Sequence, residues 1–149
     1  MSTPYCEIFN LFLFHIQDYL IDEMYNSSEE DFETYATNFL LKAIPRFRHC
    51  QKDLTDRNDT TRIFNETLND DEKDILANLM TLAWLVKETN TVLEMRNILT
   101  SGDYKAFSAA NNLKEKRSWY ETLSSDVDRQ LVEYGYDNND WDNFFQSSS

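Results

Sequence analysis

The sequence predicts an all-α protein: a helical bundle of four to five helices, with a long C-terminal helix and an irregular connection near residues 48–68. Three observations support this fold class. The 149 residues include only two glycines and two prolines, whereas a β-rich fold with many tight turns needs more of both. Hydrophobic residues make up 41% of the chain, which is enough for the core of one domain. Apolar residues also recur at helical spacings over long stretches.

The first helix is expected to begin at Thr3 and Pro4, as an N-cap followed by a proline in the first turn. Its apolar residues at spacings of three and four are Tyr5, Ile8, Phe9, Phe12, Ile16, Tyr19, Leu20 and Met24. Leu11, Leu13 and Phe14 widen this apolar surface, so the helix is expected to be buried or to cover a subunit interface. The stretch lacks a basic start and a cleavage site, and polar residues interrupt it. Neither a signal peptide nor a membrane span is therefore expected.

A second helix is expected to start near Ser27 and Glu30, which have the spacing of a capping box. Its apolar positions are Phe32, Tyr35, Ala36, Phe39, Leu40, Ala43, Ile44 and Phe47. Pro45 falls inside this pattern and removes one helical hydrogen bond. The helix is therefore expected to kink or end near Ile44.

Residues 48–68 form a polar stretch with four isolated apolar residues. These are Leu54, Ile63, Phe64 and Leu68. We expect an ordered connection that packs through these side chains and contains a short extended piece in residues 60–64. Long loops are uncommon in small domains and often have a functional or contact role.

A third helix is expected to be capped by Asn69, with acidic residues at 70–72 in the first turn, where the helix dipole favours negative charge. Its apolar residues are Ile75, Leu76, Leu79, Met80, Leu82, Ala83, Leu85 and Val86. Residues 89–91 are expected to end it and to restart a shorter helix, which a turn at residues 100–103 follows.

The last helix is expected to span residues 103–134, with the other helices packed along it. Four apolar residues recur in it every seven positions: Leu113, Tyr120, Val127 and Tyr134. This spacing places them on one face of a helix. No proline or glycine interrupts the run before Gly135, the expected C-cap. Residues 1–135 are therefore interpreted as a single helical domain.

Residues 136–149 form an acidic, aromatic C-terminal tail without a helical period. It contains three aspartates, no lysine or arginine, and four aromatic residues: Tyr136, Trp141, Phe144 and Phe145. The tail is either an unstructured end or a docking strip whose aromatic side chains bind a partner. The aspartates would then steer it towards a basic groove.

Five basic residues fall within sixteen positions of this acidic chain. They are Lys42, Arg46, Arg48, Lys52 and Arg57. Two explanations stay open: ordinary pairing with the many acidic side chains, or a contact patch for an acidic neighbour such as the tail of another copy. Head-to-tail contact of that kind builds a ring or a filament.

No motif of an enzyme or a metal site is found in the sequence. A glycine-rich phosphate loop, G-x-S-x-G and H-E-x-x-H are all missing, and Cys6 and Cys50 form no C-x-x-C pair. His15 is expected to be a packed residue, and His49 lacks further ligands for zinc. We therefore expect no enzymatic activity, catalytic residue, cofactor or metal. The net charge of −13 argues against specific nucleic-acid binding.

Two stretches carry a family resemblance: DDEKDILANLMTLAWL at 70–85 and DYKAFSAANNLKEKRSWYETLSSDVDRQLVEYGY at 103–136. Their pattern resembles small helical structural proteins of tailed bacteriophages, which act at the neck or head–tail junction as connector, adaptor or completion proteins. The N-terminal helices are additional to the shorter connector proteins.

The resemblance implies a virion structural protein that assembles in a ring, docks on neighbouring ring proteins and lets DNA pass. Its partners would be copies of itself and neighbouring virion proteins. The resemblance implies no association with a membrane. It would be located in the neck or tail region of the virion, and in the host cytoplasm during assembly. The alternative is a soluble acidic helical adaptor or inhibitor, such as a DNA mimic that binds a host or phage protein.

Overall fold

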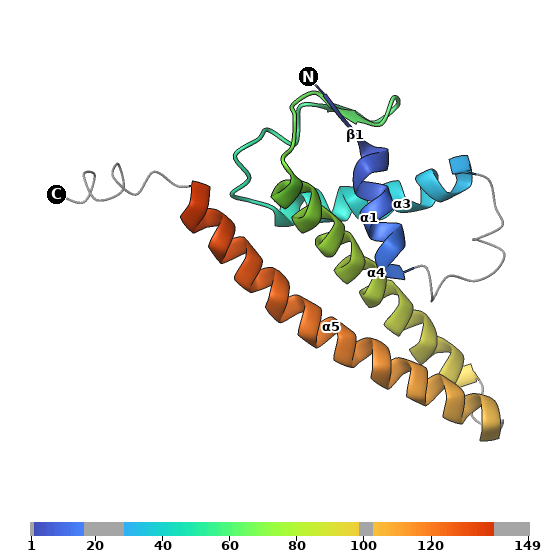
Figure 1. The fold of residues 1–149 in the computed structure, drawn as a ribbon. Helices are drawn as coiled ribbons and strands as arrows, with labels where there is room; N and C mark the ends of the chain where they lie inside the picture. The colour runs from blue at the N-terminus through green and yellow to red at the C-terminus, as the bar shows by residue number, and fades with distance from the viewer. Residues whose placement is uncertain (1, 17–28, 99–102, 139–149) are drawn as a thin grey trace.

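The computed structural model describes residues 2–16, 29–98 and 103–138, and this part of the chain is mostly helical (Figure 1). Its helices are α1 (Tyr5–Ile16), α3 (Glu29–Ala43), η2 (Ile44–Arg46, a single 3-10 turn), α4 (Asp70–Ile98) and α5 (Asp103–Asn138). Three two-residue strands, β1 (Thr3–Pro4), β2 (Arg57–Asn58) and β3 (Ile63–Phe64), form an antiparallel sheet in the order β1-β3-β2. The expected all-α class and the long C-terminal helix are confirmed.

Helices α4 and α5 lie side by side in opposite directions and form a long hairpin (Figure 1). Hydrogen bonds near one end of the hairpin show this pairing: the Gln130 side chain, near the end of α5, is hydrogen-bonded to Asp74 and Asn78 near the start of α4. The 36 residues of α5 correspond to about 54 Å at 1.5 Å per residue. Only part of this length lies beside α1 and α3, so the far end of the hairpin extends beyond them (Figure 1).

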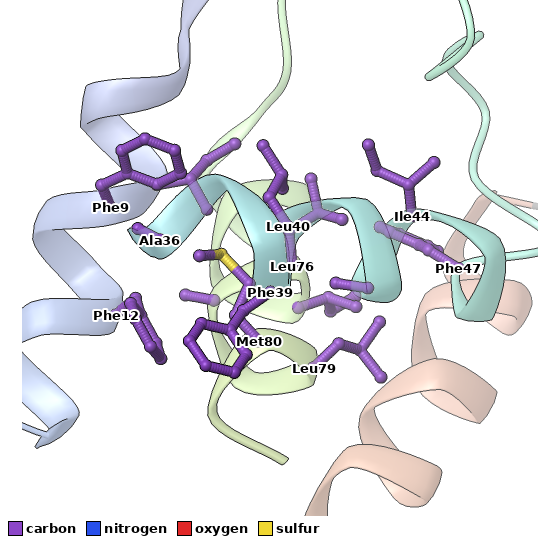
Figure 2. Close-up of a cluster of buried hydrophobic side chains, with 14 of the residues drawn as sticks. Phe9, Phe12, Ala36, Phe39, Leu40, Ile44, Phe47, Leu76, Leu79 and Met80 are labelled. Carbon is purple, nitrogen blue, oxygen red and sulfur yellow. The ribbon is translucent and has the colours of Figure 1, made fainter. Parts of the chain in front are cut away.

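The core lies where α1 and α3 pack against the first half of α4. Figure 2 shows its side chains converging from three helices: Phe9 and Phe12 from α1, Ala36, Phe39 and Leu40 from α3, and Leu76, Leu79 and Met80 from α4. These residues belong to the apolar stripes that the sequence predicts. Helix α1 is buried on this side only, since the Phe14 side chain on its other side is 73% exposed.

Two predicted helix ends are confirmed. At the start of α4, the Asn69 side chain accepts a hydrogen bond from the Glu72 amide, and the Glu72 carboxylate accepts one from the Asn69 amide, both at 2.8 Å. This reciprocal pair is a capping box. Helix α3 ends at Ala43, and Pro45 lies in the 3-10 turn that follows.

The prediction that Thr3 caps the first helix is wrong, because Thr3 belongs to strand β1 and pairs with Phe64. Its hydroxyl donates to the Glu66 carbonyl at 3.0 Å and accepts from the Leu68 amide at 2.8 Å. The Arg62 carbonyl instead accepts the first amide of α1, at Tyr5. The N-terminus of α1 is thus satisfied by a segment about sixty residues away.

Two predicted interruptions of helices are also wrong. Helix α4 continues through residues 89–91 to Ile98, and within it the Thr89 hydroxyl donates to the Val86 carbonyl at 3.0 Å. Helix α5 continues through Gly135 to Asn138, and Gly135 has no positive φ angle. A glycine inside a helix costs only about 1 kcal/mol, which packing against a neighbour offsets.

The connection after η2 contains the predicted extended piece, at Ile63–Phe64, and it packs through Leu54, Phe64 and Leu68, which are buried. At the end of its tight turn, Arg62 adopts a φ of 57° and forms ion pairs with Glu30 and Glu33 of α3. The predicted helical positions after Ile16, and the capping residue Ser27, lie outside the described residues. None of the described helices combines the length and apolar character that crossing a membrane requires.

Candidate functional site

The candidate site is a groove beside the C-terminal end of α3, with a volume of about 470 Å³. Its apolar lining includes Ile44, Phe47 and Leu54, which are buried, and Leu41, which is 39% exposed. Figure 2 shows Ile44 and Phe47 at the end of the teal helix, next to the core. A volume of this size is in the range of sites that bind ligands or side chains of a partner.

Three of the five residues of the predicted basic patch line this groove: Arg48, Lys52 and Arg57. Lys42 and Arg46 are exposed nearby, on the last turn of α3 and in η2, and are not among the lining residues. The groove therefore has three basic residues and one acidic residue, Asp53, in a chain whose net charge is −13.

The basic residues differ in their pairing. Lys52 Nζ lies 3.1 Å from the Glu72 carboxylate, and Arg57 Nε lies 3.1 Å from the Asp59 carboxylate. Within the described residues, no ion pair is found for Arg48. Asp53 is occupied by hydrogen bonds from the hydroxyl and amide of Thr55, which lower the pKa of its carboxyl. Arg48 is thus the groove cation whose charge is best placed to bind an added carboxylate.

A buried carboxylate, Glu72, joins one wall of the groove to both long helices. It accepts hydrogen bonds from the Tyr134 hydroxyl of α5 at 2.7 Å and from Lys52, which lines the groove, at 3.1 Å. The Tyr134 oxygen in turn accepts a bond from the Gln51 amide at 2.8 Å. Burial would raise the pKa of Glu72, but the bonds from the Asn69 amide, Tyr134 and Lys52 together lower it.

The Glu72 network was not predicted from the sequence, which attributes Glu72 only to the helix dipole. The spacing of Asn69 and Glu72 is a signal that would have identified the capping box. No local signal identifies Tyr134 as a partner, because it lies 62 residues further along the chain.

The tail starts next to the groove. Phe47 lines the groove, and its ring lies 5.0 Å from the ring of Tyr134, so the last turns of α5 are held against this wall. Tyr136, one of the four predicted docking residues, belongs to α5 and is 59% exposed. The other three, Trp141, Phe144 and Phe145, lie outside the described residues.

In the described part of the chain, no group of three potential metal-binding side chains is found, with or without a histidine. His15 Nδ1 lies 3.1 Å from the Thr81 hydroxyl between α1 and α4. Burial lowers the pKa of His15. His15 is therefore a packing residue, as the sequence predicts, although it is only partly buried.

Comparisons with other proteins add no relative: no family model, no curated protein and no solved structure matches the chain. The chemical capacity of the site therefore follows from its own geometry. An apolar groove with cationic side chains at its edge is chemically complementary to a peptide that combines aromatic and acidic residues.

Proposed function

We propose that this protein is a non-enzymatic structural subunit of a tailed bacteriophage, acting at the neck or head–tail junction. It assembles with copies of itself in a ring and docks on neighbouring ring proteins. The proposal rests on the sequence resemblance of residues 69–136 and on the shape of the α4–α5 hairpin, which spans the same residues.

The observation that carries it is that α5 is covered along one stripe only. Among its described side chains, four are buried: Leu113, Lys116, Val127 and Tyr134. Away from this stripe, Val132 and Tyr136 are 58% and 59% exposed. They are four residues apart and so share one face of the helix. Two exposed apolar side chains one turn apart, near the end of a long and otherwise polar helix face, are suited to a contact with a second hairpin.

The test is the mass of the protein in solution, measured by light scattering after size exclusion over a range of concentrations. We expect a large closed oligomer whose fraction rises with concentration. A strictly monomeric protein at every concentration would contradict self-assembly through α5.

A variant isolates the proposed contact. The double substitution Val132→Ser and Tyr136→Ser removes exposed apolar surface and should shift the protein towards the monomer. The control is Val132→Ile with Tyr136→Phe, which changes the same two positions but keeps their apolar surface and should leave the mass distribution unchanged. Equal masses for both variants would place the contact elsewhere.

The second candidate is a soluble acidic adaptor or inhibitor that mimics DNA. The net charge of −13 favours it, because a dense array of carboxylates resembles a phosphate backbone to a basic partner. This candidate predicts a monomer or dimer in the same measurement. It also predicts a host or phage protein that binds at low salt and is released as ionic strength rises.

A further inference from the structure

The groove beside α3 and the segment that follows α5 are complementary in chemistry. The groove combines an apolar lining with Arg48, Lys52 and Arg57. Residues 139–149 contain two aspartates and three aromatic residues, with no lysine or arginine. Aromatic side chains supply most of the binding energy in such contacts, and opposite charges orient them. We infer that the groove binds residues 139–149 of the same chain, with aromatic side chains on its apolar lining and carboxylates at Arg48.

The position of α5 brings this segment to the groove. The Tyr134 ring packs on Phe47, and its hydroxyl accepts a bond from the Gln51 amide, next to the groove residues Cys50 and Lys52. Figure 1 shows the red end of α5 alongside this connection. Asn138 is the last described residue and lies one helical turn beyond Tyr134, about 6 Å along the axis.

Residues 139–149 are long enough to reach the groove from the end of α5. Eleven residues follow Asn138 in the sequence. An extended chain covers about 3.4 Å per residue, so the first three of them already reach about 10 Å, to Trp141. The groove edge at Lys52 is linked to Tyr134 through Glu72, with hydrogen bonds of 3.1 and 2.7 Å. Trp141, Phe144 and Phe145 are therefore all within reach of the groove.

The same chain is favoured as the source over a second copy. A short connection between two binding elements gives an effective concentration in the millimolar range, far above the micromolar concentration of another copy in solution. The segment therefore fills its own groove first. This inference does not depend on whether the protein forms a ring, because the proposed ring contact uses Val132 and Tyr136 on the outer face of α5.

The test measures the distance from Trp141 to the groove in the full-length chain. Its three tryptophans, Trp84, Trp119 and Trp141, are replaced by 5-fluorotryptophan, and the Trp141 fluorine signal is assigned with Trp141→Phe. A nitroxide spin label is placed at Asn38→Cys, an exposed α3 position one turn before Leu41 that does not line the groove. Cys6→Ser and Cys50→Ser remove the native thiols.

Two samples separate the sources of the segment. In the first, the doubly labelled chain is diluted in excess unlabelled protein, and we expect the label to remove most of the Trp141 signal. In the second, fluorinated chains without the spin label are mixed with spin-labelled chains without fluorine, and we expect an unchanged signal. Loss of signal in the second sample alone would identify a second copy as the occupant and overturn the inference. An unchanged Trp141 signal in both samples would show that the groove does not bind the segment.

Charge variants test the role of Arg48. Arg48→Glu should restore the Trp141 signal of the first sample, whereas Lys114→Glu, an equal charge change at an exposed α5 residue away from the groove, should not. Once the nitroxide has been reduced, so that it no longer weakens nearby signals, the signals of Trp84, which is buried, and Trp119, which packs against it, report that each variant is folded. If both charge variants behave alike while those two signals stay in place, the assigned role of Arg48 is wrong.

Discussion

At the scale of single residues, Glu72 illustrates how a charged side chain is accommodated in the core. Its side chain has no exposed surface, yet it accepts hydrogen bonds from Asn69, Tyr134 and Lys52. A buried carboxylate without partners would be neutral, because desolvation disfavours its charged form. Here the partners reverse that effect and lower the pKa of Glu72. The carboxylate consequently holds α4, α5 and the groove wall together more strongly when it is ionised than when it is protonated.

The first prediction concerns the pH dependence of this network. A group with a lowered pKa in the folded state stabilises the fold above its unfolded value, about 4.3 for glutamate, and this stabilisation is lost as pH falls through the lower folded value. Glu72→Gln should therefore reduce the free energy of unfolding at pH 7 by about 2 kcal/mol. It should also flatten the loss of stability below about pH 5. Urea unfolding across this pH range provides the measurement.

The control is Asp71→Asn, in the same first turn of α4 but exposed, which should change the free energy of unfolding by less than about 0.5 kcal/mol. If Asp71→Asn and Glu72→Gln have the same effect, the helix dipole explains the acidic turn and the buried network contributes nothing.

The second prediction concerns Thr3, whose buried hydroxyl connects β1 to the end of the connection. Thr3→Val keeps the shape of the side chain but leaves the buried Leu68 amide without its partner. The free energy of unfolding should fall by about 1–3 kcal/mol. Chemical unfolding of Thr3→Val, Thr3→Ser and Ser2→Ala checks this. Thr3→Ser retains the hydroxyl and Ser2 is exposed, so both should remain close to the parent. A stable Thr3→Val variant would mean that the hydroxyl is dispensable.

At the scale of secondary-structure elements, the α4–α5 hairpin is held in register by polar contacts as well as by its apolar stripe. Lys116 is buried on α5, and its Nζ lies 3.1 Å from the Glu88 carboxylate and 5.3 Å from the centre of the Trp84 ring on α4. Further along the hairpin, Gln130 bonds Asp74 and Asn78. Directional contacts of this kind select one register, which apolar packing alone does not.

The third prediction follows from this arrangement. Lys116→Ala should remove the ion pair, the contact of the ammonium with the Trp84 ring, and the packing of the side-chain methylenes. The expected loss in free energy of unfolding is about 2 kcal/mol, since Glu88 is then left partly buried without its partner. Lys114→Ala, two residues earlier and exposed, is the matched control and should be nearly neutral. Thermal and urea unfolding of both variants should rank them in this order, and the reverse order would contradict the register role.

At the scale of the whole molecule, charge opposes folding while apolar burial favours it. A net charge of −13 on 149 residues causes repulsion throughout the compact state. The ion pairs of the described residues act over short distances in space, such as Arg62 with Glu33 at 2.9 Å and Lys73 with Glu7 at 3.0 Å. They leave the overall excess of carboxylates unchanged.

The fourth prediction is that salt stabilises the fold. The Debye length shortens from about 30 Å at 0.01 M to about 8 Å at 0.15 M, so long-range repulsion is screened before the short buried pairs are. The melting temperature, followed by circular dichroism, should therefore rise over this interval. The proposed contact of the tail with Arg48 should weaken over the same interval. A melting temperature that falls with salt would show that attractive pairs outweigh the net repulsion.

Much of the fold follows from local sequence. Helical spacing of apolar residues identifies the helices, Asn69 identifies the start of α4, and Pro45 identifies the end of α3, because each of these signals acts on the backbone within a few residues. For the candidate site, the cluster of basic residues was recognised, and Arg48, Lys52 and Arg57 do line the groove. The sequence does not reveal that apolar residues line a groove, since Ile44 and Phe47 have the same spacing as the buried residues of an amphipathic helix.

By itself, then, the sequence determined the helical class, the two helix ends and the contrast between an acidic tail and a basic cluster. Tertiary structure decided which distant groups meet: Thr3 with Leu68, and Tyr134 with Glu72. It also decided that α4 runs through residues 89–91 and that α5 runs through Gly135. Local propensities in these segments differ by about 1 kcal/mol or less, so they leave the ends of these helices undecided. The meeting of distant groups depends on the path of the whole chain, which no local pattern specifies.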